Sequence, residues 1–169
     1  MADTVFIGLG SNLGDTASNL QQGAKVVGRL ASGSLAGSSI WTSRPEGFDE
    51  EVPDFSNAVL KMKVTLGPET LLSRLLQIEN EFGRVRPSRD GYQSRILDLD
   101  IIDFGGRVQS SVNLSLPHPR AHLRKFVLLP LHELDPEFRF PDREERLEAL
   151  ISAAAENDMV RLIPLIPSG

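Results

Sequence analysis

Apolar positions in the first two thirds of the chain switch between strand-like and helix-like spacing. A short apolar run at residues 5–9 predicts a buried strand. Apolar residues at Leu20, Ala24, Val27 and Leu30 share one face of a helix predicted over 16–30. A Gly/Ser-rich loop is expected at 31–37. The same criteria then predict strands at 38–43 and 58–64, a helix at 68–82 and a strand at 96–104.

The predicted elements follow the order β-α-β-β-α-β, which is typical of ferredoxin-like folds. The remaining third predicts a short helical piece near 127–134 and a helix over 143–156. No internal repeat, linker or low-complexity tract interrupts the pattern. At 169 residues the chain has the usual length of one domain, so we expect residues 1–169 to form a single domain.

Composition narrows the classes of function. The chain has no cysteine, which excludes disulfides, thiolate zinc sites and cysteine nucleophiles. Its net charge of −5 disfavours nucleic acid and anionic membranes as partners. No apolar stretch approaches the roughly 20 residues of a membrane span, and no signal peptide is evident. We therefore expect a soluble cytoplasmic protein that binds neither nucleic acid nor membrane.

Two carboxylates stand out in the strand predicted at 96–104. Side chains alternate along a strand, so Asp98 and Asp100 share one face while Leu97, Leu99 and Ile101 share the other. Neighbouring carboxylates repel each other, and a divalent cation relieves that repulsion. Magnesium prefers oxygen ligands and is usually held by one or two carboxylates plus substrate phosphates. We predict a metal site at Asp98 and Asp100. Asp103 is expected out of phase with them, on the leucine side of a regular strand.

An arginine cluster precedes this pair. Guanidinium groups match phosphate oxygens with a planar donor fork, so Arg84, Arg86 and Arg95 beside a metal site indicate a bound triphosphate. Arg89 alone is more simply a solvated loop residue. A second basic set includes His118 and Arg124, and for His118 a functional role and a packed loop role are equally open. His132 is expected to be structural.

The glycines after the first strand do not predict a dinucleotide site. Gly8, Gly10 and Gly14 do not have the spacing G-x-G-x-x-G, and no acidic residue follows at the required distance. A Walker sequence is absent as well. Close packing and a sharp turn explain these glycines more simply.

Taken together, the motifs resemble those of the 6-hydroxymethyl-7,8-dihydropterin pyrophosphokinase family. The matching stretches are IGLGSNLGD (7–15), DFSNAV (54–59), IE (78–79), GRVR (83–86), RILDLDI (95–101), PHPR (117–120) and RKFVLLPL (124–131). They occur in family order over most of the chain, and their combination is highly specific although each one is weak alone.

The resemblance implies an α+β fold with a ferredoxin-like βαββαβ core and additional C-terminal helices, in a three-layer α/β/α arrangement. It also implies a monomeric cytoplasmic enzyme of folate biosynthesis that uses ATP and two Mg²⁺ ions held by Asp98 and Asp100. It further implies ATP contacts at the positions Glu79, Arg84, Arg95, His118 and Arg124, and a pterin slot at Ser43, Phe55, Asn57, Tyr92 and Phe126. Arg86 is added to the ATP contacts from the arginine cluster.

The implied reaction is attack by the pterin hydroxymethyl oxygen on the β-phosphorus of ATP, with AMP leaving. Arg84 and Arg95 would stabilise the charge of the transferred and leaving groups. Two other hypotheses remain open from the sequence: a magnesium-dependent transferase with another acceptor, and a ferredoxin-like nucleotide-sensing module without catalysis.

Overall fold

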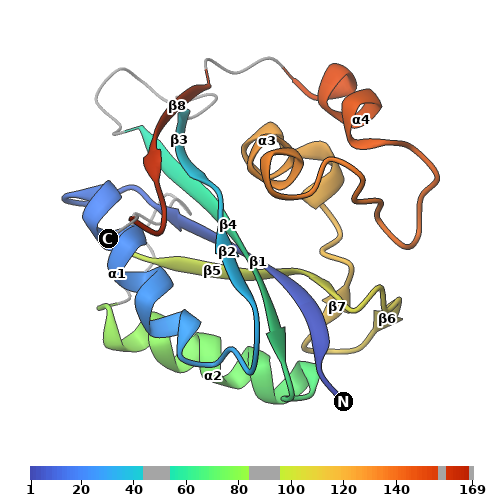
Figure 1. The fold of residues 1–169 in the computed structure, drawn as a ribbon, viewed down its shortest axis with the longest axis horizontal. Coiled ribbons are helices and arrows are strands. Elements are labelled where there is room, and N and C mark those ends of the chain that lie inside the picture. Colours follow the sequence, from blue (N-terminus) through green and yellow to red (C-terminus); the bar gives the residue numbers. More distant parts are fainter. Residues whose placement is uncertain (44–53, 84–95, 156–158, 168–169) are drawn as a thin grey trace.

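The computed structural model describes residues 1–43, 54–83, 96–155 and 159–167, and its main feature is an antiparallel sheet (Figure 1). The sheet runs in the order β5-β1-β4-β3-β8, and β2 also pairs with β4. The strands are β1 (Asp3–Ser11), β2 (Leu35–Gly37), β3 (Ser39–Ser43), β4 (Phe55–Val64), β5 (Asp98–Phe104) and β8 (Val160–Pro164). Strand β1 therefore lies between β4 and β5, with β5 at one edge of the sheet.

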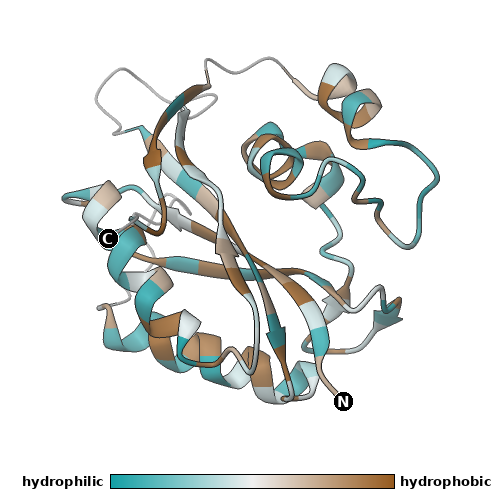
Figure 2. Cartoon of the chain, in the orientation of Figure 1, coloured by the Kyte–Doolittle hydropathy of each residue, from teal (hydrophilic) through white to brown (hydrophobic). Residues whose placement is uncertain are grey.

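Helices cover both faces of this sheet. One face carries α1 (Thr16–Gly28) and α2 (Pro68–Glu81), and their apolar side chains form one core with strand residues such as Ile7, Leu60 and Leu99. The other face carries α3 (Lys125–Leu134) and α4 (Leu147–Ala153), which form a second core with Phe6, Val59 and Ile102. Figure 2 shows that α1 and α2 each carry both hydrophobic and hydrophilic residues along the ribbon. The structure is thus a mixed α/β fold with an antiparallel sheet between helices.

Local chemistry explains where α1 and α2 begin. The Asp15 side chain accepts a hydrogen bond from the Ser18 N–H at 3.1 Å and caps the first turn of α1. Gly14, just before it, has a φ of 70°, a left-handed conformation that favours glycine. Pro68 occupies the first turn of α2, where its missing N–H costs no helical hydrogen bond. Both predicted helices are confirmed, with ends one or two residues earlier than expected.

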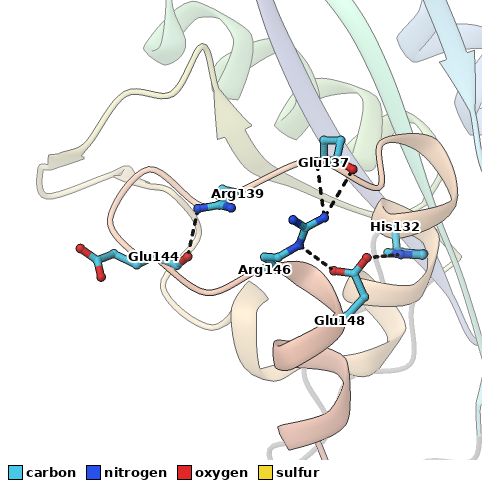
Figure 3. Close-up of polar contacts among 6 residues, drawn as sticks. All are labelled: His132, Glu137, Arg139, Glu144, Arg146 and Glu148. Atoms are coloured by element: carbon cyan, nitrogen blue, oxygen red, sulfur yellow. Dashed lines mark hydrogen bonds and ion pairs between the residues drawn. The ribbon is translucent and has the colours of Figure 1, made fainter.

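Exposed ion pairs lie where α4 meets α3 and the segment that follows α3 (Figure 3). His132 on α3 lies 3.2 Å from Glu148 on α4. Arg146 lies 3.4 Å from Glu137 and 3.6 Å from Glu148. The structural role predicted for His132 agrees with this contact. Exposed pairs of this kind add little stability one by one, so the apolar second core contributes most of the packing of α4.

Several short elements were not predicted. Strand β2 occupies part of the stretch expected as the loop 31–37, and β8 lies in a segment for which no strand was expected. The hairpin of β6 (Gln109–Ser110) and β7 (Ser115–Leu116) and the 3₁₀ turn η1 (Ala121–Leu123) were also missed. All five residues of β8 are exposed, so its sequence has no alternation of buried and exposed positions to reveal a strand.

The helix predicted over 143–156 was too long. It begins only at Leu147, because Arg146 has the extended backbone of an N-cap residue, with φ −75° and ψ 158°. Leu147 and Leu150 are the residues that α4 buries. The charged residues 143–146 have no apolar face to pack and form no regular secondary structure. Among the described helices, none is long and apolar enough to cross a membrane.

The expectation for Asp103 was wrong because β5 is not regular. Its pairing with β1 shifts between Phe6 and Ile7, so that Asp103 lies opposite Phe6 and Ile101 opposite Ile7. Ile102 is the extra residue in this bulge. Asp103 therefore does not lie on the buried face of the strand that contains Leu99. It is nevertheless buried, with 4% of its surface exposed.

Candidate functional site

The two predicted metal-binding carboxylates lie on edge strand β5 next to β1. In the register of the two strands Asp98 lies opposite Gly10 and Asp100 opposite Gly8. Leu99 and Ile101 are 5% and 4% exposed and belong to the core beneath α1 and α2, whereas Asp98 and Asp100 are only half-buried. The alternation predicted from the sequence is confirmed. It places both carboxylates on the α3 side of the sheet.

On this face of the sheet Gly10 packs closely against residues of both neighbouring strands. A Cβ atom at Gly10 would lie 3.0 Å from the Asn57 Oδ1 atom and 3.9 Å from the Asp98 Cβ atom. Gly10 is paired with Asn57 on β4 and with Asp98 on β5. The amide of Asn57 and the carboxylate of Asp98 therefore flank a position without a side chain. With strands spaced about 4.8 Å apart, the Cα atoms of Asn57 and Asp98 lie roughly 10 Å from each other.

The predicted acceptor residues that the structure describes come from three elements. Ser43 on β3 pairs with Phe55 on β4, and Asn57 follows two residues later on the same strand. Ser43 and Asn57 are buried, and Phe55 is half-buried. Phe126 lies in the first turn of α3, which packs on β3 and β4, and the Arg124 guanidinium lies 5.6 Å from the centre of its ring. Tyr92 lies outside the described residues.

His118 is tied to β5 through its backbone, and its ring is held by the turn that follows it. Its N–H donates to the Ile102 carbonyl at 2.9 Å, and its Nδ1 accepts from the Arg120 N–H at 3.1 Å. Burial lowers the pKa of His118, and the charges of Arg124 and Arg120 lower it further, while the charge of Asp98 raises it. The structure thus brings His118, Arg124 and Asp98 within electrostatic reach of one another.

Glu79 supports the carboxylate pair from the opposite side of the sheet. It lies on α2, is 3% exposed, and its Oε2 accepts a hydrogen bond of 2.7 Å from the Leu99 N–H. Leu99 lies between Asp98 and Asp100 in the chain. The buried carboxylate of Glu79 therefore holds the backbone from which both predicted metal ligands project.

A pocket of about 270 Å³ lies at the exposed edge of β5. Apolar side chains contribute part of the wall, and Asp100 and His118 contribute two polar groups. The lining residues are Leu72, Leu99, Asp100, Ile101, Ser111, Val112, Asn113, Leu114, Ser115, His118 and Pro119. Sequence reasoning did not point to Leu72 or to the turn at 111–115. Leu72 has the spacing of a core residue, and the turn has the composition of an ordinary loop.

The described residues fit a magnesium site of the kind that substrate completes. Within the parts of the chain that the structure describes, no group of three or more histidine, aspartate or glutamate side chains is placed to hold a metal ion. Two carboxylates alone bind Mg²⁺ with help from water and substrate phosphates, which is its usual mode in nucleotide sites. The predicted phosphate-binding residues Arg84, Arg86 and Arg95 lie outside the described residues.

The chain matches known proteins over nearly its whole length. A family model described as 7,8-dihydro-6-hydroxymethylpterin-pyrophosphokinase (HPPK) matches residues 6–136. The 2-amino-4-hydroxy-6-hydroxymethyldihydropteridine pyrophosphokinase of Haemophilus influenzae is 38% identical over 95% of this chain and 99% of that protein. The protein of the same name from Pseudomonas aeruginosa is 38% identical over 92% of this chain and 95% of that protein.

Solved structures agree on the fold. Wild-type HPPK-DHPS of Plasmodium falciparum, solved with pteroate, has a TM-score of 0.68 at 14% identity and is matched over 90% of this chain. This chain spans 42% of that longer one. At such low identity the likeness shows the fold alone. The family model and the two bacterial relatives are more specific, and from them we conclude that the chain belongs to the 7,8-dihydro-6-hydroxymethylpterin-pyrophosphokinase family.

Proposed function

We propose that this chain transfers a pyrophosphoryl group from Mg-ATP to 6-hydroxymethyl-7,8-dihydropterin in folate biosynthesis, giving the pterin diphosphate and AMP. The observation that carries the proposal is that Asn57 and Asp98 flank Gly10 on one face of the sheet, one on each neighbouring strand. An amide can recognise the edge of a pterin ring, and a carboxylate can hold a metal-bound triphosphate. The acceptor and the donor would meet above Gly10.

The acceptor would bind on the β3–β4 side of Gly10. Phe55 and Phe126 offer aromatic faces for a flat heterocycle, and Asn57 and Ser43 offer hydrogen bonds to its edge. Tyr92 completes the proposed slot by family resemblance. Because Asn57 is 9% exposed, its amide is already fixed in place before a ligand binds, which lowers the entropic cost of recognition.

The nucleotide would bind on the β5 side. The pocket beside β5 offers apolar walls, including Leu72 and Leu114, that suit a purine base. Asp100 and His118 line the same pocket, so a triphosphate leading away from the base would pass toward the carboxylate pair. Arg124 acts electrostatically on His118, as a neighbour of that path would. Further proposed ATP contacts are Glu79, Arg84, Arg86 and Arg95.

Two Mg²⁺ ions are proposed at Asp98 and Asp100. When bound, they would neutralise the triphosphate and polarise the reacting phosphorus. The chain's own part is to hold both carboxylates in register, which the pairing with β1 and the Glu79–Leu99 hydrogen bond accomplish. In the reaction the pterin oxygen bonds to the β-phosphorus, the bond from that phosphorus to the α,β-bridging oxygen breaks, and AMP leaves. Arg84 and Arg95 are proposed to stabilise the developing charge.

The decisive experiment is product analysis with purified protein, ATP, Mg²⁺ and the pterin alcohol. We expect the protein to release AMP and pterin diphosphate in equal amounts. Release of ADP or pyrophosphate instead would favour a transferase of another kind. Nucleotide binding without any turnover would favour a sensing module.

The metal assignment is tested by Asp98→Ala and Asp100→Ala. Each variant is expected to lose about 10³-fold in turnover, since several kcal/mol of charge stabilisation depend on the metal. Circular dichroism should show an intact fold, because both side chains are half-buried and not part of either core. Turnover within tenfold of the wild type in either variant would contradict the assignment.

We also propose the finer features of the architecture. The strand order β5-β1-β4-β3 and the element order β1-α1-β3-β4-α2-β5 support a ferredoxin-like core in three α/β/α layers. Residues 1–169 would form one domain, which works as a monomer in the cytoplasm. Sedimentation velocity would test the oligomeric state.

A further inference from the structure

One carboxylate joins the end of α3 to strand β3. Glu133 Oε1 accepts from the Ser39 N–H at 3.0 Å and from the Trp41 Nε1–H at 3.2 Å, and its Oε2 accepts from the Ser39 hydroxyl at 2.6 Å. Three hydrogen bonds therefore end on one side chain. An anionic acceptor makes each of them stronger than a neutral acceptor would.

The position of Glu133 within α3 is unfavourable for the helix itself. It lies one residue before the end of α3, where a negative charge opposes the helix dipole. It is also exposed, so it adds nothing to the apolar core. Contacts with β3 are the only described interactions that offset this local cost. We therefore look for the role of Glu133 in the residues that its contacts with β3 hold in position.

The contacts of Glu133 with β3 lie beside the proposed acceptor site. Trp41 pairs directly with Asn57 in the register of β3 and β4. Trp41 is also covered by the Arg161 guanidinium of β8, 6.0 Å from its ring centre. Glu133 is thus hydrogen-bonded to β3, the strand that pairs with β4 at Asn57. The other end of α3 carries Phe126, the proposed aromatic wall of the acceptor slot.

Helix α3 packs on β4 and β3 and follows directly on the turn η1. A helix of 10 residues is about 15 Å long, so its two ends lie at different places on the sheet. At its start, the Arg124 N–H donates to the Ala121 carbonyl at 3.2 Å and closes the turn η1, which leads into α3. Glu133 holds the opposite end on β3. Because a helix is stiff, the contacts of Glu133 with β3 help to set the distance between Phe126 and the β3–β4 pair.

We propose that Glu133 is a positioning residue for the pterin acceptor: by tying α3 to Ser39 and Trp41 it sets the spacing between Phe126 and the strand pair that carries Phe55 and Asn57. The inference rests on the proposed function. It concerns acceptor binding, because the nucleotide side has its own anchors at His118 and Glu79.

The test compares Glu133→Ala with Glu133→Gln and with a matched control. Glu137→Ala removes an equally exposed glutamate, just beyond α3, whose described partner is Arg146. For Glu133→Ala we expect KM for the pterin alcohol to rise about tenfold, with KM for Mg-ATP changed less than about twofold. Glu137→Ala should match the wild type in both KM values.

The Glu133→Gln variant separates a positioning role of Glu133 from a general loss of stability. The Glu133→Gln amide oxygen can still accept from the Ser39 and Trp41 N–H groups, and its NH₂ can donate to the Ser39 hydroxyl. We expect it to restore KM for the pterin to within about threefold of the wild type, the remainder being the loss of charge. Trp41 is the only tryptophan, so intrinsic fluorescence reports directly on this contact. Its emission should change in Glu133→Ala and return in Glu133→Gln.

Three results would overturn the proposal: an unchanged KM for the pterin in Glu133→Ala, an equal rise in both KM values, or Glu133→Gln as impaired as Glu133→Ala. If Glu133→Ala does not fold, Trp41→Phe removes one of the three hydrogen bonds and should raise the same KM about threefold. If the wild-type protein releases no AMP, the proposed function itself is wrong. That result differs from all three above, so failure of the proposed function can be told apart from failure of the role proposed for Glu133.

Discussion

Gly10 matters because of the side chain that it lacks. A Cβ atom there would lie 3.0 Å from Asn57 Oδ1, closer than nearly all real contacts of this kind, so the amide would have to move. Asn57 is buried and has little room to adapt. We predict that Gly10→Ala raises KM for the pterin about tenfold with a smaller effect on KM for Mg-ATP, measured by initial rates of AMP release.

Gly33→Ala is the matched control for this prediction. There the added Cβ would meet the Lys63 Cβ at 3.6 Å, an ordinary contact far from the proposed site. Its kinetics should equal those of the wild type. Equal pterin KM values for Gly10→Ala and the wild type would show that the close fit of Asn57 against Gly10 is not needed for the acceptor.

Asp103 is a buried acid that the proposed chemistry does not use. Its Oδ2 accepts from the Gly106 N–H at 3.1 Å, but among the described residues its buried Oδ1 has no hydrogen-bond partner. Burial raises the pKa of Asp103 above its usual 3.8, and the Gly106 hydrogen bond only partly opposes this. Its stabilising contribution is therefore present below pH 3.8 and lost as the pH rises through the folded-state pKa.

We predict that Asp103→Asn stabilises the protein at neutral pH. The amide cannot ionise, so the variant should exceed the wild type by about 1 kcal/mol in unfolding free energy at pH 8 and match it near pH 3. Urea unfolding at both pH values measures the difference. Asp142→Asn, at an exposed position, should stay within about 0.5 kcal/mol of the wild type throughout. A less stable Asp103→Asn at pH 8 would contradict the argument.

At the scale of elements, α2 and β5 depend on each other through Glu79. Its carboxylate is buried against the Leu99 N–H, so truncation would leave that donor without its partner inside the protein. We predict that Glu79→Ala lowers the unfolding free energy by about 3 kcal/mol, measured by urea titration. It should also reduce turnover, since the backbone of Asp98 and Asp100 loses its support.

Glu81→Ala, at the exposed end of the same helix, controls for helix propensity and net charge. It should change stability by less than about 0.5 kcal/mol. A role for Glu79 in ATP contact alone would predict a change in KM for Mg-ATP without loss of stability, which the same pair of variants would reveal.

At the scale of the whole molecule, two cores share one sheet. Leu20 on α1 and Leu128 on α3 are both fully buried, one in each core. We predict that Leu20→Ala and Leu128→Ala each lower the unfolding free energy by about 3 kcal/mol. Unfolding should remain a single transition, with Trp41 fluorescence and far-UV circular dichroism coinciding. Two separate transitions would contradict the proposal of one domain, and Leu128→Ala should affect turnover more because α3 carries Phe126.

The parts of the fold that could be predicted have a strong local signal. The helices starting at Thr16 and Pro68 carry an apolar stripe and a recognisable first turn, and β5 carries strict alternation around Asp98 and Asp100. The same alternation is why the carboxylate pair could be placed on one face. The spacing of Gly8, Gly10 and Gly14 also indicated packing rather than a nucleotide loop, which the close contact at Gly10 supports.

What could not be predicted depends on contacts between distant segments. Strand β8 exists because it pairs with β3, and Asp103 changed faces because of a bulge opposite Phe6. The pocket beside β5 joins Leu72 of α2 to the turn near Asn113, and Glu133 meets Trp41 across 92 positions of the chain. Local patterns determine which residues form a helix or strand and which share a face, because those choices depend on neighbours in sequence. Register, bulges and the meeting of remote side chains are settled only when the sheet and helices pack, because their energies come from partners that local patterns do not identify.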